Sequence, residues 1–185
     1  MEKAATALKP EERDGSDLLG VVAAARAGDP AALAMLYRRF ADAALAVAYR
    51  LLLSRADAED VVHDLFLGLP EALRKYEERG ALAAWLKRVT VRLALSRLRA
   101  PSRREVALEA AHAVATRPAD PAGRIDLVDA LAALPASLRA VLVLKEIEGF
   151  SHAEIAGMLG ISTGASEVRL HRALRTMRRA LSEEG

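Results

Sequence analysis

The sequence predicts an all-α protein made of two small helical bundles joined by a flexible linker. Of the 185 residues, 40 are alanine and 29 are leucine, which favour helices, whereas the residues that favour strands are comparatively scarce. Apolar residues recur at helical spacing before residue 100 and again after residue 124. Between these parts, residues 101–123 contain three prolines and no strongly apolar face, which is typical of a linker.

These breaks divide the chain into four segments. We expect residues 1–17 to be a disordered N-terminal extension, residues 18–100 the first bundle, residues 101–123 the linker and residues 124–185 the second bundle. The length alone is compatible with one domain or with two small ones. In separate bundles few contacts need to cross in the free protein, although the second bundle can cover part of the basic face from Lys87 to Arg99.

Local signals place the helices of the first bundle. Residues 28–30, Gly-Asp-Pro, predict the end of one helix and the start of the next, because glycine ends helices, aspartate caps them and proline fits the first turn. Asp57 is expected to cap a helix over residues 58–76. Gly80 then interrupts the pattern before a helix over residues 85–99.

The second bundle begins with two predicted helices. The first covers residues 127–134 and stops before Pro135, because a proline disfavours helical geometry in the residue that precedes it. The second covers residues 137–148 and ends at Gly149.

A helix-turn-helix follows. Ser151 and Glu154 match a capping box, in which each side chain satisfies a backbone donor at the helix start. That helix ends at Gly160, Ser162 can cap the next one, and the last helix runs to about residue 181.

Composition argues against several classes of function. The absence of cysteine excludes disulfides, thiolate metal sites and cysteine nucleophiles, and the four histidines are scattered. No phosphate-binding loop, zinc-protease motif or dinucleotide turn is present, so we expect no catalytic residues, no cofactor, no metal site and no enzyme activity. Without a secretory signal or an apolar run near the roughly 20 residues of a membrane span, we expect a cytoplasmic protein with no membrane insertion.

Charge is unevenly distributed, although the net charge is only +2. Residues 57–64 contain four acids and no base, whereas residues 87–104 contain seven bases and no acid. Residues 169–179 contain five arginines and again no acid. Arginine runs without carboxylates are typical of proteins that bind a phosphate backbone. The alternative is that each run is an ordinary solvated helix face.

The helix-turn-helix and the arginines after it predict duplex DNA binding. In this motif the second helix enters the major groove, whose width accepts a helix. The arginine run favours this interpretation over an ordinary helical hairpin. We expect the first residues of the second helix to face bases, and Arg172 and Arg175 to contact phosphates. The candidate residues are Ser162, Thr163, Ala165, Ser166, Glu167, Arg169, Arg172 and Arg175.

Two sets of short motifs support this assignment. In the second half they are Leu134-Pro135, Leu138–Val141, Glu148–Ala156, Leu159–Ser162 and Arg169–Ala173. In the first half they are Ala25–Asp29, Leu36-Tyr37, Ala58–Leu67, Ala84–Val89 and Arg97–Arg99. The second-half set resembles region 4, and the first-half set region 2, of bacterial sigma factors of the extracytoplasmic-function (ECF) group of the sigma-70 family. The resemblance covers about residues 17–100 and 124–182 and follows the family's order.

The resemblance implies a sigma factor, which binds core RNA polymerase and directs promoter recognition and transcription initiation. It implies that the acidic helix docks on the clamp helices of the polymerase. The residues of this contact would be Glu59, Asp60, Asp64, Leu65 and Phe66. The alternative is that the two apolar residues are core and the acids favour the helix start. In the family an anti-sigma factor is a further partner, and the sequence leaves open whether this chain has one.

The resemblance also assigns the two promoter elements. The −10 element would be bound as unstacked single-strand bases, as single strands generally are. Its candidate residues are Lys87, Arg88, Arg92, Ser96, Arg97 and Arg99. The helix-turn-helix candidates would read the −35 element. Arg92 stands where the family commonly has asparagine, Ser96 where it has aspartate and Glu167 where it has a basic residue, so we expect an altered sequence preference. Trp85 is expected to be a core residue rather than a stacking platform.

Two other functions stay open at this point. One is a helix-turn-helix regulator that binds DNA alone as a dimer, and the other is a helical adaptor with no DNA role. Binding to core RNA polymerase separates the sigma factor from both.

Overall fold

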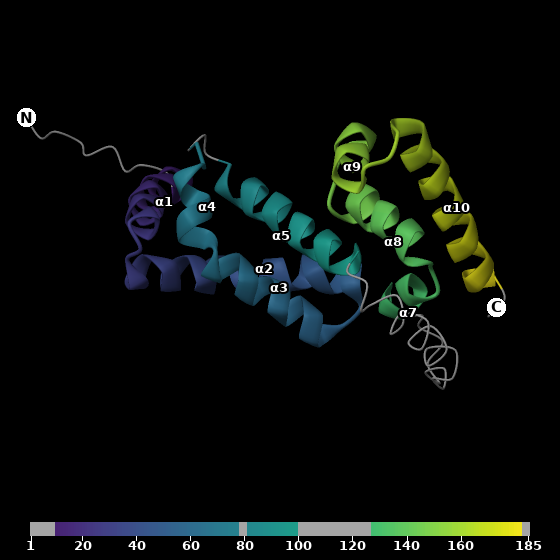
Figure 1. The fold of residues 1–185 in the computed structure, drawn as a ribbon, viewed down its shortest axis with the longest axis horizontal. Coiled ribbons are helices and arrows are strands. Elements are labelled where there is room, and N and C mark those ends of the chain that lie inside the picture. The colour runs from purple at the N-terminus through teal and green to yellow at the C-terminus, as the bar shows by residue number, and fades with distance from the viewer. Residues whose placement is uncertain (1–9, 78–80, 100–126, 183–185) are drawn as a thin grey trace, which may run out of the picture.

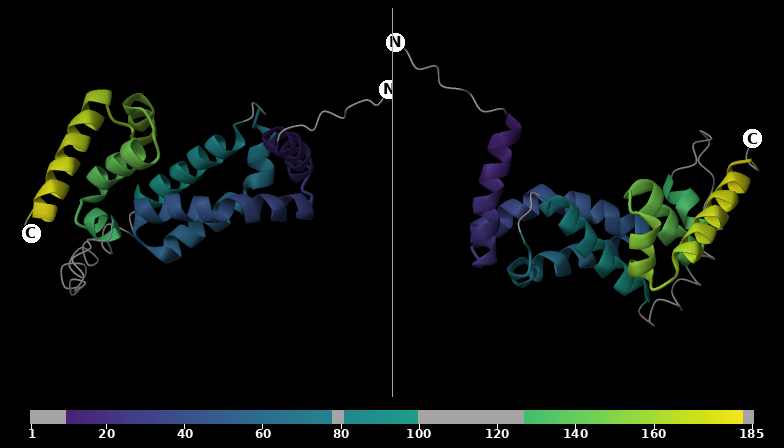
Figure 2. Two further views of the ribbon diagram at one scale, coloured as in Figure 1. Left: turned by 180° about the vertical axis from the view of Figure 1, so that it is seen from behind. Right: turned by 90° about the horizontal axis from the view of Figure 1, so that it is seen from above.

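The computed structural model describes residues 10–77, 81–99 and 127–182, and these residues form helices and no strand (Figure 1). The expected linker, residues 101–123, lies outside the described residues. The helices form two bundles along an elongated molecule, with α1 at one end and α10 at the other (Figures 1 and 2). The predicted all-α class with two helical bundles is confirmed.

The first bundle is built on three helices that contact one another. Its elements are α1 (Pro10–Arg26), α2 (Pro30–Leu52), α3 (Arg55–Leu67), α4 (Leu69–Arg74) and α5 (Leu82–Arg99). Helices α2, α3 and α5 lie side by side, and α1 and α4 meet at the end far from the second bundle (Figures 1 and 2). Because α1 begins at Pro10, the expected disordered extension over residues 1–17 is wrong for residues 10–17, which are helical.

The turn between α1 and α2 forms as predicted. Gly28 has a φ of 87°, and the Asp29 carboxylate accepts a hydrogen bond from the amide of Ala31 at 2.8 Å. Pro30 occupies the first turn of α2, where a helix has no partner for an N–H group.

The helix predicted over residues 58–76 is instead two helices. The N-cap is Ser54, whose hydroxyl accepts a hydrogen bond from the amide of Asp57 at 3.4 Å, so α3 begins three residues earlier than expected. Helix α3 ends before Gly68 because Pro70, in the first turn of α4, has no N–H group to continue the hydrogen-bond ladder of α3. Asp57 is therefore not the cap, and its side chain faces α5.

In the second bundle the earlier helices pack against the last helix, α10. Its elements are α7 (Leu127–Ala132), α8 (Ala136–Leu142), the π-helical turn η1 (Val143–Ile147), α9 (His152–Leu159) and α10 (Thr163–Ser182). The helix predicted over residues 137–148 is thus an α-helix followed by one wider turn, in which the amide of Glu148 donates to the carbonyl of Val143 at 2.9 Å.

The helix-turn-helix is confirmed in its details. The amide of Glu154 donates to the Ser151 hydroxyl at 3.3 Å and the amide of Ser151 donates to the Glu154 carboxylate at 3.0 Å, which completes the capping box. Gly160 ends α9 with a φ of 66°, and the Ser162 hydroxyl accepts from the amide of Ala165 at 3.1 Å.

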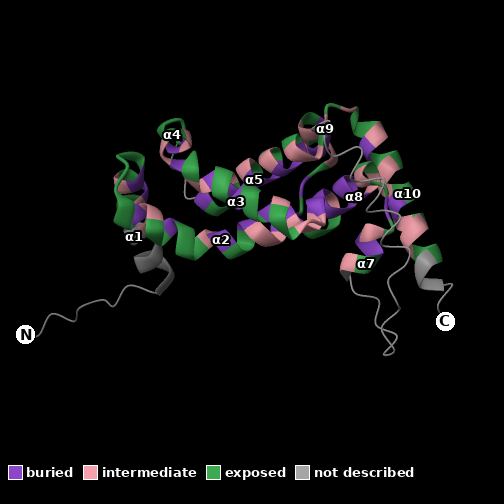
Figure 3. Cartoon of the chain, turned by 60° about the horizontal axis from the view of Figure 1, so that its bottom comes forward, coloured by how far each residue is buried: buried purple, intermediate pink, exposed green. Residues whose placement is uncertain are grey.

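One hydrophobic cluster extends across both bundles. From the first bundle it includes Val47, Leu51, Val91 and Leu95, and from the second it includes Leu131, Val141, Leu144, Phe150 and Ile155. Figure 3 shows the buried residues along the sides where the helices face one another. A second cluster, which includes Leu36, Leu69, Leu73 and Leu82, lies inside the first bundle. As expected, few contacts cross between the helices of the two bundles, chiefly those of α2 with α8, although side chains of both bundles join this cluster. We call the arrangement in which the two bundles touch the closed arrangement.

No helix within the described ranges is both long and apolar enough to cross a lipid bilayer.

A matched glycine pair on α9 tests the turn of the motif. Gly160→Ala should lower the free energy of unfolding by about 1 kcal/mol, because alanine is strained at a positive φ. Gly157→Ala should raise it by about 0.5–1 kcal/mol, because Gly157 is exposed in a helix with open space around it. Urea unfolding measures both. Equal shifts in the two variants would contradict the left-handed turn.

Candidate nucleic-acid and partner interfaces

Helix α5 presents to solvent a polar stripe that carries three arginines. Arg88, Arg92, Ser96 and Arg99 are all exposed, and their spacing places them on one face of the helix. The opposite side is core, where Val91 and Ala94 are fully buried. We call these four exposed residues the α5 stripe. The other two candidates for the −10 element, Lys87 and Arg97, are partly buried and face other parts of the protein.

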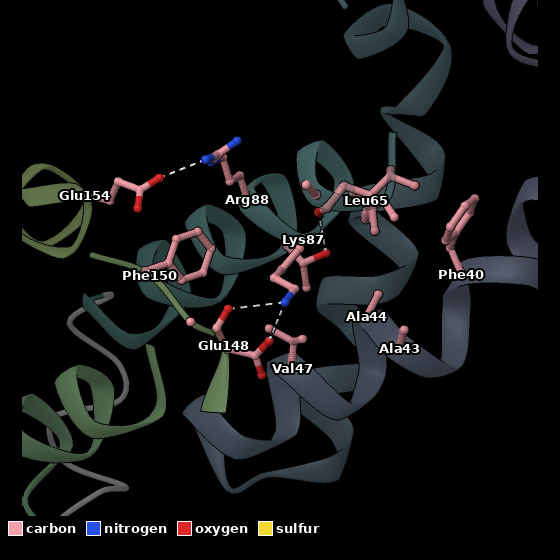
Figure 4. A pocket seen from close by; sticks show the side chains of 15 residues that line it. Phe40, Ala43, Ala44, Val47, Leu65, Lys87, Arg88, Glu148, Phe150 and Glu154 are labelled. Carbon is pink, nitrogen blue, oxygen red and sulfur yellow. Dashed lines mark hydrogen bonds and ion pairs between the residues drawn. The ribbon is translucent and has the colours of Figure 1, made fainter. Parts of the chain in front are cut away.

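The second bundle supplies carboxylates to bases of the first. Glu148, whose side chain is 3% exposed, contacts Arg50 of α2 at 2.5 Å and Lys87 of α5 at 3.3 Å. Arg88 contacts Glu154, the capping-box residue of α9, at 2.7 Å (Figure 4). The ion pairs with Arg50 and Lys87 offset the cost of burying Glu148, and they form only when both bundles touch. Lys87 and Arg88 are thereby occupied by carboxylates where a DNA ligand would offer phosphates.

The seam between the bundles is not completely filled. A pocket of about 420 Å³ lies between α2, α5 and the loop before α9 (Figure 4). Its apolar lining includes Phe40, Ala44, Val47, Leu65 and Phe150, and its charged lining includes Lys87, Arg88, Glu148 and Glu154. An interface that combines ion pairs with an incompletely packed apolar seam resembles one between domains that move relative to each other.

A buried arginine fixes α8 against the end of α2. Arg139 is 9% exposed and donates to the carbonyls of Leu51 and Leu134, each at 3.2 Å. Burial lowers the pKa of the Arg139 guanidinium from its ordinary value. The two carbonyls lie at the C-terminal ends of α2 and of the α7 segment, where helices leave acceptors without partners. Arg139 belongs to the motif that resembles region 4, but its role in joining the bundles was not evident from the sequence.

The acidic helix α3 presents a mixed surface. Glu59, Asp60 and Asp64 are exposed, as predicted, and Glu59 pairs with Arg55 at 2.8 Å. Leu65 is 3% exposed and belongs to the core, so it is corrected from a docking residue to a packing residue. Leu67 is 73% exposed and lies about one turn beyond Asp64, and it was not among the predicted docking residues.

Two aromatic pairs support the surfaces of the first bundle. Phe66 is half-buried, and its ring lies 4.9 Å from that of Tyr37, which is 50% exposed. The ring of Trp85 lies 4.9 Å from that of Tyr76 and packs on the core of the first bundle. The core role predicted for Trp85 agrees with this placement.

Helix α10 divides its predicted DNA-binding residues between solvent and core. Thr163, Glu167, Arg172 and Arg175 are exposed, and Ala165 and Arg169 are half-buried. Ser166 is fully buried and its hydroxyl lies 2.9 Å from Nδ1 of His152, so it joins α9 to α10 and is corrected from a base-reading to a packing residue. Val168 is 51% exposed beside Glu167. Val168 was not among the predicted DNA-binding residues.

Comparison with known families agrees with these two units. Residues 36–104 match the family model described as Sigma-70 region 2, and residues 124–177 match the one described as Sigma-70, region 4. The class defined by the fold and these matches is the sigma-70 family.

Individual relatives narrow the class. The chain is 33% identical over 171 residues to the ECF RNA polymerase sigma factor SigM of Mycobacterium tuberculosis. This alignment covers 92% of this chain and 86% of SigM. It is 34% identical over 168 residues to the ECF RNA polymerase sigma factor SigE of Mycolicibacterium smegmatis, covering 84% of this chain and 65% of SigE. A solved complex of the sigma factor RpoE with the anti-sigma factor NepR from Bartonella quintana matches with a TM-score of 0.57 and 26% identity, over 80% of this chain and 95% of that one. The chain belongs to the ECF RNA polymerase sigma factors.

If the Glu148 ion pairs stabilise the closed arrangement, removing the charge of Glu148 should favour an open one. Glu148→Gln should lower the free energy of unfolding by about 1–3 kcal/mol and increase the radius of gyration, because Arg50 and Lys87 lose a charged partner. Thermal unfolding and small-angle scattering measure these effects. Glu146→Gln, an exposed neighbour, is the control and should change neither. Identical behaviour of the two variants would show that Glu148 does not hold the bundles together.

Glu154 serves as a reporter of the contact between bundles. The amide of Ser151, then Arg88 and the Ser151 hydroxyl, lower the pKa of Glu154 from 4.5 to about 2. The folded state therefore favours the ionised form, and its contribution to stability is present above the unfolded pKa and is lost as the pH falls towards about 2.

Arg88→Ala should raise the pKa of Glu154, although it stays below 4.5 because the bonds to Ser151 remain. Arg92→Ala, one turn along the α5 stripe, should leave this pKa unchanged. NMR titration of the Glu154 side chain measures both variants. An unchanged pKa in Arg88→Ala would mean that the bundles are apart in solution.

Proposed function

We propose that this chain binds core RNA polymerase and directs it to promoters, with the first bundle (residues 18–100) reading the −10 element and the second (residues 124–185) reading the −35 element. The observation that carries the proposal is that each of the two matched family regions presents one exposed, arginine-bearing helix face, on α5 and on α10. Two modules on one chain gain affinity when both engage the same DNA. The chemistry of transcription belongs to the polymerase, so the chain needs no catalytic residue, and its proposed place of action is the cytoplasm.

The α5 stripe is suited to the single-stranded −10 element. Arg88, Arg92 and Arg99 place three positive charges along one face, and single strands are bound by such a charged track together with base stacking. Arg92 adds a charge where the family commonly has asparagine. We infer that this chain relies more on backbone contacts at that position than its relatives do.

The exposed face of α10 is suited to the duplex −35 element. Glu167 can accept a hydrogen bond from the amino group of cytosine, and Val168 can contact a thymine methyl group. Arg172 and Arg175 lie further along the same helix, where a helix docked in the major groove passes close to the phosphates of the DNA backbone. Ser166 is left out of this set because it is buried.

The polymerase-docking surface is proposed to be the exposed part of α3 with its aromatic neighbours. It consists of Glu59, Asp60, Asp64, Phe66 and Leu67, with Tyr37 beside them. An exposed apolar centre with an acidic rim is complementary to a basic partner helix. Phe66 belongs to this surface, as the sequence predicted. Leu67 belongs to it in place of the buried Leu65, and Tyr37 is an additional member.

Opening of the closed arrangement is part of the proposal. Arg88 donates through Nη2 to Glu154, whose negative charge repels a phosphate at the same guanidinium, so separation of the bundles makes the whole α5 stripe available to DNA. An anti-sigma factor is included among the proposed partners because the related RpoE is known in complex with one.

Two exposed leucines provide a matched test. The chain should bind purified core RNA polymerase, and Leu67→Asp should weaken that binding about tenfold or more, because it places a charge in an apolar contact. Leu19→Asp changes an exposed leucine of α1 and should leave binding unchanged. Fluorescence titration with core enzyme measures affinity, and sequencing of the transcripts made by the complex identifies the promoters.

The outcomes separate the alternatives. A chain that binds duplex DNA but not core polymerase would be a stand-alone regulator, and one that binds neither would be an adaptor. Equal effects of the two leucine substitutions would remove α3 as the docking surface.

A further inference from the structure

Arg97 lies at the centre of three carboxylates on the neighbouring helix. Asp57, Asp60 and Asp64 follow one another at helical spacing on the side of α3 that faces α5. The guanidinium of Arg97 contacts Asp60, reaches Asp64 at 3.3 Å and reaches Asp57 at 3.5 Å. Each of its three nitrogens therefore has a carboxylate partner.

The cluster is accessible rather than enclosed. The side chains of Asp60 and Asp64 are 57% and 53% exposed, and that of Arg97 is 31% exposed. Three carboxylates around one guanidinium leave an excess of negative charge, and each carboxylate keeps acceptor sites that face solvent. Ion pairs of this exposure are weak and exchange readily with other charged partners.

The cluster connects two proposed surfaces that would otherwise be independent. Asp60 and Asp64 belong to the polymerase-docking surface on α3, whereas Arg97 sits next to Ser96 in the α5 stripe. The carboxylates compete with a DNA phosphate for Arg97, because each of its three nitrogens already faces a carboxylate and their negative charges repel the phosphate. In the free chain each surface therefore neutralises a charge that the other surface needs.

We propose that Arg97 is a positioning residue that couples polymerase docking on α3 to DNA binding on α5. This inference rests on the proposed function. Basic side chains of the polymerase that dock on Asp60 and Asp64 take the place of the Arg97 guanidinium. Arg97 is then released from these carboxylates and binds a phosphate at the C-terminal end of α5. By thermodynamic reciprocity, DNA that holds Arg97 leaves the carboxylates available to the polymerase.

The proposal predicts opposite effects of one substitution on two affinities. Arg97→Gln should strengthen binding to core polymerase in the absence of DNA by roughly two- to fivefold, because the aspartates lose their internal competitor. The gain should shrink at high salt, since the contact is exposed. The holoenzyme made with the same variant should bind promoter DNA more weakly, with a salt slope lower by about one unit for the lost phosphate contact.

Two further variants keep the test sharp. Arg99→Ala removes an exposed base of the α5 stripe that has no ion pair among the described side chains, so it should weaken DNA binding but leave core affinity unchanged. Arg97→Lys keeps one charge but cannot serve three carboxylates, and it should bind core with an affinity between those of Arg97→Gln and the unaltered chain. Thermal unfolding of each variant shows that the fold is retained.

The experiment uses the full chain, purified core polymerase and a forked DNA that carries a start site mapped from the transcripts of the complex. A merely structural ion pair would make Arg97→Gln bind core more weakly or equally, and that result overturns the coupling. If the unaltered chain does not bind core at all, the proposed function fails instead. The two failures are therefore distinguishable.

Discussion

The closed arrangement of this protein buries one carboxylate whose charged partners lie in the other bundle. Glu148 comes from the second bundle, but both of its cationic partners, Arg50 and Lys87, come from the first. Burial of this carboxylate costs free energy, and the ion pairs that offset the cost form only when the two halves touch. Around it, Arg139 donates to the end of α2 and Phe150 enters the shared hydrophobic cluster. The packing of the two bundles therefore depends on polar groups that have partners only when both are present.

The other functional surfaces follow from how each helix divides its sides. Helix α5 uses one side for the core, one for the exposed stripe and a third for Arg97, which faces α3. Helix α3 likewise buries Leu65 while Leu67 faces solvent. Because side chains one or two positions apart on a helix point in different directions, a run of like charges is not one surface. The charges of such a run are divided among several surfaces of the helix, and each surface has its own partner.

Local signals in the sequence were sufficient for much of the fold. The Ser151–Glu154 capping box, the left-handed Gly160 and the Asp29-Pro30 start each depend on residues within a few positions, and each forms as predicted. Predictions that depended on distant partners were less accurate. Asp57 was assigned to a cap because the sequence does not reveal that α5 brings Arg97 to it.

The candidate site shows the same division. The arginines of α5 and α10 were predicted to bind a phosphate backbone because they occur in runs without acids, and most of them are exposed. Ser166 was assigned to base reading because it lies near the start of the second helix, yet the packing of α9 on α10 buries it against His152. Leu67 and Val168 were overlooked because their exposure depends on which side of the helix the rest of the bundle covers. That information is contained in tertiary contacts rather than in residue type.

The wider turn of η1 makes the second bundle tolerant of chain length at this point. A π-helical turn contains one residue more than the α-helical turn that it replaces, and such turns behave as single-residue insertions. Both kinds of turn complete one revolution about the axis, so removing one residue there would restore a regular helix and leave Glu148 on nearly the same side. The helix-turn-helix itself would stay intact, because its caps and turn lie beyond this point. One extra residue is thus accommodated before Glu148 without turning its carboxylate away from Arg50 and Lys87.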